Sequence, residues 1–157
     1  MAAVGGIEPG QQGCDAPADS TCLRQVLLLG TPALWWGGAA ALLYAGYAWL
    51  LRRDWRAGLA IVGLLTTWVP FFANADRPIF SFYAITTLPF TIAAVCLVLG
   101  RVVGPAAPTR RRMWGTAVAG VFVVLVVLNF AWFWPLYTHQ LVTTREWLQR
   151  IWFEAWI

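Results

Sequence analysis

Asp76 and Arg77 are adjacent charged residues directly before an aromatic run, and the cationic side chain of Arg77 is suited to binding an anion. The guanidinium of Arg77 can hold a phosphate through paired hydrogen bonds. The rings of Phe80, Phe82 and Tyr83 can pack along an isoprenoid chain. One interpretation is therefore a lipid-phosphate site. The other, which residue types alone favour, is that Asp76 and Arg77 cap neighbouring helix ends and pair with each other.

The three cysteines and the single histidine offer little other chemistry. Cys14 and Cys22 are close enough in sequence to close a short disulfide loop in an oxidising compartment, although the residues leave open whether they are bonded. A metal site is disfavoured, because two thiols without a neighbouring histidine are half of a tetrahedral ligand set. We expect Cys96 to act as a small apolar side chain. For His139 we expect an exposed hydrogen-bonding role rather than catalysis.

The composition indicates an integral membrane protein. Of the 157 residues, 60% are hydrophobic and 11% are charged, which is too apolar for the surface of a soluble domain of this size. Eleven tryptophans suit a chain that meets lipid headgroups. Disorder, a nucleic-acid-binding domain and a small disulfide scaffold are disfavoured. The formal net charge of +4 is better explained by where the arginines lie.

Long uncharged stretches predict an all-α fold with four transmembrane helices. About 20 apolar residues are needed to cross the hydrocarbon core of a bilayer. The predicted module covers residues 32–137, and its spans are residues 32–51, 57–75, 78–100 and 113–137. Small residues in the first and fourth spans predict close helix contacts; they are Gly37, Gly38, Ala39, Ala40, Ala41, Gly115, Ala119 and Gly120.

The arginines predict the orientation of these spans. The connection at 52–56 holds three arginines, and the connection at 101–112 holds four. Because arginine collects in cytoplasmic loops, we expect both connections inside the cell and both termini outside it, in the plasma membrane. A topology signal is favoured for the triplet Arg110, Arg111 and Arg112 over the alternatives of a nucleic-acid patch or an anionic-lipid site.

The two terminal segments differ from the spans. Residues 1–31 are predicted to form an external loop or tail, since they have no basic segment followed by an apolar core as in a signal peptide. Residues 138–157 are predicted to form an external amphipathic helix at the membrane surface. Thr143 and Glu146 have the spacing of a capping box that would start this helix.

The predicted spans contain no catalytic motif. No carboxylate lies within them, which argues against proton-coupled transport by this chain alone. A phosphate-binding glycine loop, a nucleophile elbow and closely spaced paired carboxylates are also missing from the sequence. We therefore expect no metal, no cofactor and no nucleic-acid partner.

Four segments in order resemble the C-terminal four-span module of actinobacterial protein O-mannosyltransferases. The similar segments are residues 30–37, 53–56, 76–90 and the ending at 133–157. No one motif is diagnostic alone, but the order and the predicted topology match across nearly the whole chain. Residues 139–144 depart from the family pattern, where glycine and proline are expected.

The resemblance implies a membrane glycosyltransferase that uses polyprenyl-phosphate-mannose as donor. Such enzymes transfer mannose to Ser or Thr hydroxyls of secreted proteins by inversion at the anomeric carbon, with an acidic residue as base. The family's acidic pair lies in a first external loop without a counterpart here, so we expect a C-terminal piece that carries no catalytic residue and is inactive alone. Arg77 matches the family's arginine and is the candidate for gripping the donor phosphate. Asp76 and Tyr83 would orient it or line its pocket.

Two other functions are compatible with the residues. One is a small non-enzymatic membrane protein that assembles with a partner through its Gly and Ala faces. The other is a four-span exporter, which the lack of a membrane-embedded carboxylate disfavours.

Overall fold

The computed structural model describes residues 6–17, 20–27, 30–72, 81–107 and 109–153 of the chain. These residues fall into two compact units, which we describe separately. One unit covers residues 30–127, and the other combines residues 1–29 with residues 128–157. Helix α4, Arg110–Tyr137, contributes its first part to the one and its last part to the other.

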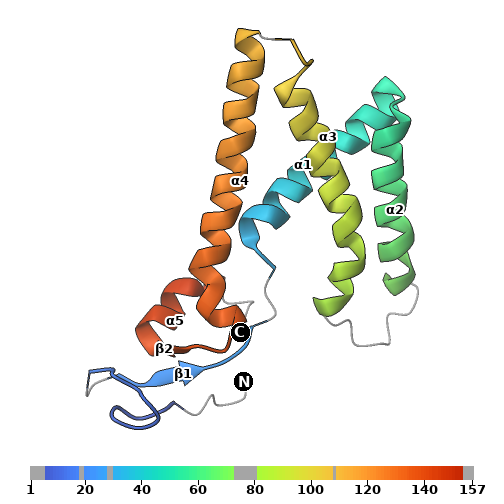
Figure 1. Cartoon of the computed structure of the whole chain (residues 1–157). Coiled ribbons are helices and arrows are strands. Elements are labelled where there is room, and N and C mark those ends of the chain that lie inside the picture. Colours follow the sequence, from blue (N-terminus) through green and yellow to red (C-terminus); the bar gives the residue numbers. More distant parts are fainter. Residues whose placement is uncertain (1–5, 18–19, 28–29, 73–80, 108, 154–157) are drawn as a thin grey trace. The chain divides into compact units, whose positions relative to one another are not determined.

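The larger unit is built from helices α1 (Pro32–Arg52), α2 (Trp55–Phe72) and α3 (Leu88–Val103), the 3-10 helix η1 (Ser81–Thr87) and the start of α4 (Figure 1). Proline in the first turn of α1 and of α3 suits the helix start, where no internal partner is needed for its missing N–H. Asp54 caps the start of α2, because its Oδ1 accepts the backbone N–H of Arg56 at 3.0 Å. In the third predicted span, residues 78–80 lie outside the described part, residues 81–87 form the 3-10 helix η1, and the α-helix starts at Leu88.

The core of this unit consists mainly of alanine. Ala41, Ala45 and Ala48 recur along one face of α1 and pack with alanines of α2 and α3. Close helix packing also involves glycine: a Cβ on Gly38 would lie 2.4 Å from Thr91 Cγ2, and one on Gly115 would lie 2.2 Å from the carbonyl oxygen of Val102. The predicted small-residue contacts are thus confirmed at these two positions.

Gly120 is different, because a Cβ placed there would meet nothing within 4 Å. The expectation of a close contact at this residue was wrong for the described part of the chain. Large apolar side chains of α4 are also exposed, among them Val121, Val124 and Val127. The face of α4 that the sequence assigns to helix packing is therefore shared between a close contact at Gly115 and open surface further along.

Three helical segments are long and apolar enough to cross a membrane: Trp55–Phe72, Ala84–Val103 and Arg110–Tyr137. Helix α1 has the necessary 21 residues, but its glycines, tyrosines and tryptophans lower its mean hydropathy. The prediction of membrane-spanning helices is confirmed for three segments. The fourth crossing, by α1, stays a prediction.

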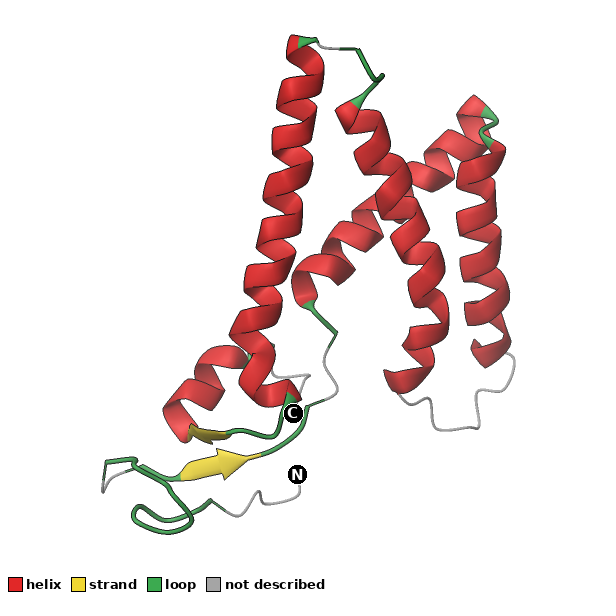
Figure 2. Cartoon of the chain, viewed as in Figure 1, coloured by secondary structure: helices red, strands yellow, loops and turns green. Residues whose placement is uncertain are grey.

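The smaller unit joins the two ends of the chain. Strand β1 (Cys22–Arg24) pairs antiparallel with β2 (Leu141–Thr143), with Leu23 opposite Val142 (Figure 2). The all-α prediction therefore needs a correction, since the chain is mainly helical but has this two-stranded sheet. Short strands separated by more than a hundred residues have no local sequence signature, because their pairing depends on long-range contacts.

Helix α5, Thr144–Arg150, follows β2 and begins with the predicted capping box. Thr143 Oγ1 accepts the N–H of Glu146 at 3.2 Å, and Glu146 Oε2 accepts the N–H of Thr143 at 3.1 Å. The helix ends at Arg150, so the predicted helix through Ile151 and Trp152 was wrong. The ring of Trp152 instead packs edge-on against Phe133, with centroids 5.0 Å apart.

Candidate functional site

The predicted phosphate site consists of Arg77, Asp76 and Tyr83. Asp76 and Arg77 lie outside the described residues. Tyr83 is described only as part of the backbone of η1. The grouping of these three side chains and their role therefore stay a prediction.

An apolar cavity lies in the larger unit, lined by residues of α1 and by residues on both sides of the Arg77 connection in sequence. Its volume is about 210 Å³. The lining residues are Trp35, Ala39, Leu42, Leu64, Leu65, Trp68, Thr87 and Thr91. They belong to α1, α2, η1 and α3, so the cavity exists only where these elements meet. Trp68 precedes the connection by one turn of α2, and Thr87 follows it at the end of η1.

The two threonines of this lining offer no free donor to a ligand. Thr87 Oγ1 donates to the carbonyl of Ala84 at 2.7 Å, and Thr91 Oγ1 donates to the carbonyl of Thr87 at 3.0 Å. Both residues are buried, with 2% of their surface exposed. Because the hydroxyl protons are used internally, the cavity presents methyl groups and rings. It is suited to hydrocarbon rather than to a sugar or a phosphate.

Sequence reasoning missed this cavity. Its residues are common in any membrane helix, and their helical spacing places them on inner faces without showing where a void is left. Phe90 and Gly63 are a partial sign of the packing beside this cavity. The ring of Phe90 fills the space next to Gly63, where an added Cβ would lie 2.1 Å from the ring. The glycine admits the ring between α2 and α3, which positions the start of α3 beside the cavity lining.

At the α1–α2 turn, an ion pair joins two connections that the sequence marks as basic. Arg101 of α3 donates from Nη2 to Oδ2 of Asp54. The same guanidinium lies over the ring of Tyr44, 5.3 Å from its centroid. Asp54 thus caps the start of α2, and its ion pair with Arg101 holds the end of α3 near the α1–α2 turn. This arrangement fixes the three helices at one end, and it contains no group that is free for catalysis.

In the smaller unit, Cys14 and Cys22 are joined by a disulfide, with their Cα atoms 5.9 Å apart. Both cysteines are buried, and a second link lies beside them, since Ile7 and Cys22 exchange backbone hydrogen bonds of 2.8 and 2.9 Å. The N-terminal segment is therefore folded around β1. Cys96 is unpaired and exposed on α3, and its role as a small apolar side chain stays a prediction.

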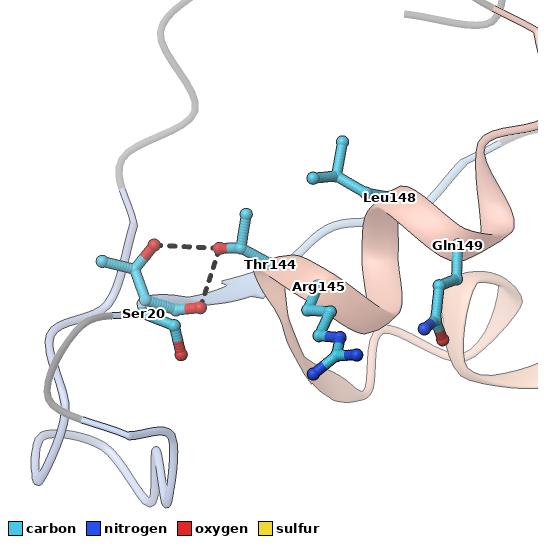
Figure 3. A pocket seen from close by; sticks show the side chains of 6 residues that line it. Ser20, Thr144, Arg145, Leu148 and Gln149 are labelled. Carbon is cyan, nitrogen blue, oxygen red and sulfur yellow. Dashed lines mark hydrogen bonds between the residues drawn. The ribbon is translucent and has the colours of Figure 1, made fainter.

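An open groove of about 620 Å³ lies where the N-terminal segment meets α5 (Figure 3). Its residues are Ser20, Thr21, Thr144, Arg145, Leu148 and Gln149. Thr144 Oγ1 lies 2.8 Å from the Thr21 carbonyl and 2.9 Å from Thr21 Oγ1. Figure 3 shows Arg145 and Gln149 extending from α5 on the same side. The groove is open, and its threonine hydroxyls serve mainly to hold the two segments together.

Arg150 and Trp132 form a second contact that sequence analysis missed. Arg150 Nε donates to the Trp132 carbonyl at 3.0 Å, and its guanidinium lies 4.8 Å from the Trp132 ring centroid. Arg150 Nη1 also donates to the Glu146 carbonyl at 2.8 Å. The arginine thus ties the end of α5 to α4. It is engaged in structure, as is expected for a planar cation that can stack and donate at once.

His139 lies at an exposed turn after α4, with a positive φ of 56°. The predicted exposure is confirmed, and a hydrogen-bonding role for His139 stays a prediction. Among the described residues, no group of three His, Cys, Asp or Glu side chains could hold a metal ion.

The curated proteins to which this chain is similar share one name. The polyprenol-phosphate-mannose--protein mannosyltransferase of Mycobacterium tuberculosis is 39% identical over 145 residues, which are 92% of this chain. Proteins of the same name from Mycolicibacterium smegmatis and Corynebacterium glutamicum are 36% and 31% identical over similar lengths. The resemblance to protein mannosyltransferases is confirmed.

This mannosyltransferase relationship covers only a part of each relative. The matched segment is 27% of the Mycobacterium tuberculosis protein, so the chain spans about a quarter of the length of the curated relatives it matches. No protein-family model matches the chain, and no solved structure matches it.

Proposed function

We propose that this chain is a C-terminal membrane portion of a protein O-mannosyltransferase that transfers mannose from a polyprenyl-phosphate donor to Ser or Thr of proteins. The observation that carries the proposal is the match across 92% of the chain to relatives named for this reaction. The named donor is a lipid, and membrane-spanning helices are the setting in which a lipid donor is met.

Within that enzyme, the chain would contribute to donor binding. The apolar cavity supports a place for part of the prenyl chain, because its lining is hydrocarbon and its threonine hydroxyls are occupied. Arg77 would hold the donor phosphate, with Asp76 and Tyr83 beside it. As the bond to mannose breaks, negative charge grows on the departing phosphate, and a guanidinium there would stabilise it.

The acceptor hydroxyl also needs a base. No carboxylate lies in the described helical spans 57–72, 84–103 or 113–137. We expect the base to belong to a segment of the full-length enzyme outside the matched quarter, and we expect this chain to be inactive alone.

The proposed topology has four crossings, with α1 as the first, and both termini outside the plasma membrane. Two observations support it. The basic connections at 52–56 and 101–112 follow the positive-inside rule. The Cys14–Cys22 disulfide and the β1–β2 pairing suit an oxidising exterior for both terminal segments.

The donor role is tested in the full-length parent enzyme carrying Arg77→Ala, with mannosyl transfer measured against donor concentration. Loss of one hydrogen-bonded charge to phosphate should cost about 2–3 kcal/mol, or roughly thirty- to 150-fold in kcat/KM. Arg77→Lys should recover part of the activity. Unchanged turnover and donor KM in Arg77→Ala would refute the phosphate role.

Activity of the chain alone is tested with membranes that contain only this polypeptide, compared with membranes that contain the parent. Transfer by the parent but not by the chain is expected. If the parent also fails to transfer mannose from polyprenyl-phosphate-mannose, the non-enzymatic assembly role becomes the better explanation.

A further inference from the structure

Helix α4 begins with three consecutive arginines, which differ in exposure and in hydrogen bonding. Arg110 and Arg111 are exposed, whereas Arg112 is half-buried and donates from Nη1 to the carbonyl of Pro105 at 3.0 Å. The first turn of α4 has no acidic residue. In the part of the chain that the structure describes, none of these guanidinium groups lies in an ion pair. Three positive charges are thus gathered, and no described carboxylate pairs with them.

An open groove of about 790 Å³ lies against two of these arginines. Its lining residues are Thr109, Arg110, Arg112, Met113, Thr116 and Ala117. They are three and four residues apart, so they form one face over the first two turns of α4. Arg111 is not part of that lining. The groove has a cationic end and continues into small and apolar side chains.

The same helical face remains open beyond the groove. At Gly120 an added Cβ would meet nothing within 4 Å. Val124 and Val127, one and two turns further along, are each more than half exposed. The segment belongs to a candidate membrane span, Arg110–Tyr137. A smooth apolar track therefore leads from the arginines along the helix, in the direction in which a lipid chain would lie.

We propose that this groove binds an anionic glycerophospholipid, with its phosphate between Arg110 and Arg112 and one acyl chain along Met113, Ala117 and Gly120. The combination selects the ligand: the charges complement a phosphate, and the apolar face below them complements hydrocarbon. A nucleic acid or a soluble phosphate would leave that face in contact with water or bulk lipid. The site is independent of the proposed mannosyl transfer.

The test uses the purified full chain in detergent, with native mass spectrometry to count bound dioleoyl phosphatidylglycerol and, as the neutral comparator, dioleoyl phosphatidylcholine. Phosphatidylglycerol should be retained preferentially. Arg110→Gln should weaken its binding about fivefold, the effect of removing one arginine near a phosphate. Arg111→Gln removes the same charge one residue away and should leave binding within twofold of the original chain.

A second variant tests the apolar part. Ala117→Trp fills the groove without changing the charge, and it should also weaken phosphatidylglycerol binding. Ala117→Leu is the smaller substitute if the tryptophan variant loses helical circular dichroism. Equal weakening by Arg110→Gln and Arg111→Gln would overturn the proposal, because it would mean attraction by overall charge. Full displacement of the lipid by millimolar inorganic phosphate would also overturn it, since the site would then be a simple anion site.

Discussion

The hydroxyl oxygens of Thr21 and Thr144 lie 2.9 Å apart, although 123 positions separate the two residues. Thr144 also donates from its backbone N–H to the Thr21 carbonyl at 2.9 Å. Together with β1 and β2, these bonds join the N-terminal segment to the segment after α4. The smaller unit therefore depends on contacts between the N-terminal and C-terminal segments.

Thr144→Val keeps the shape of the side chain but removes its two hydroxyl contacts. We expect a loss of about 1 kcal/mol in the stability of the smaller unit, the usual net contribution of such bonds. Hydrogen exchange at residues 21–24 should accelerate roughly fivefold. Thr138→Val is the matched control, because its hydroxyl bonds to Trp134 on the exposed side of α4. Equal acceleration in both variants would contradict a specific Thr21–Thr144 tie.

The Cys14–Cys22 disulfide predicts how many thiols are free to react before and after reduction. Of the three cysteines, only Cys96 should react with maleimide in denatured, unreduced protein, and all three should react after reduction. Replacing Cys14 and Cys22 by serine should destabilise the smaller unit by about 2.5 kcal/mol, because the unfolded chain regains the freedom of a short loop. Labelling of three thiols before reduction in protein taken from the cell envelope would contradict the bond.

Gly63 is expected to tolerate no larger side chain. Its Cβ position lies 2.1 Å from the ring of Phe90, so Gly63→Leu should overpack the α2–α3 contact and cost about 1–3 kcal/mol. Thermal unfolding in detergent measures the effect. Gly46→Ala is the control, since its Cβ would meet nothing within 4 Å, and its melting temperature should not fall. Unchanged melting of Gly63→Leu would mean that α2 and α3 are not packed at this point.

The Asp54–Arg101 pair predicts a smaller effect. Both side chains are partly exposed, at 23% and 32%, so solvent screening limits the contribution of the pair to about 0.5–1 kcal/mol. Arg101→Gln removes the ion pair and the contact with Tyr44 but leaves Asp54 capping α2. Its melting temperature should fall slightly, and the fall should shrink at high salt. A salt-independent loss would assign the effect to packing on Tyr44 instead.

The proposed orientation predicts which positions are accessible outside the cell. In a Cys96→Ala background, in which Cys14 and Cys22 stay bonded, one added unpaired cysteine in place of Arg53 should resist a membrane-impermeant maleimide in intact cells, and one in place of His139 should react. Both residues have positive φ at exposed turns, which makes them a matched pair. External labelling at position 53 would contradict the proposed orientation, in which the 52–56 connection lies inside the cell.

Much of this protein was determined by its sequence through local forces. Apolar stretches predict helices because the bilayer requires internal backbone hydrogen bonding, and three such spans are confirmed. The capping box of Thr143 and Glu146 was predictable, since its two hydrogen bonds form within one turn. The mannosyltransferase resemblance was also readable from the order of its motifs and is confirmed by the relatives.

Only the tertiary structure decided how distant segments meet. Local propensity favoured one helix that continued through Trp152. In the structure the backbone is extended at Ile151, and the ring of Trp152 packs against Phe133. The β1–β2 pairing, the Thr21–Thr144 bonds and the cavity at Thr87 likewise depend on chain segments brought together by folding. Sequence periodicity assigns a side chain to a face, whereas shape matching between faces determines which contact is made and where a space remains.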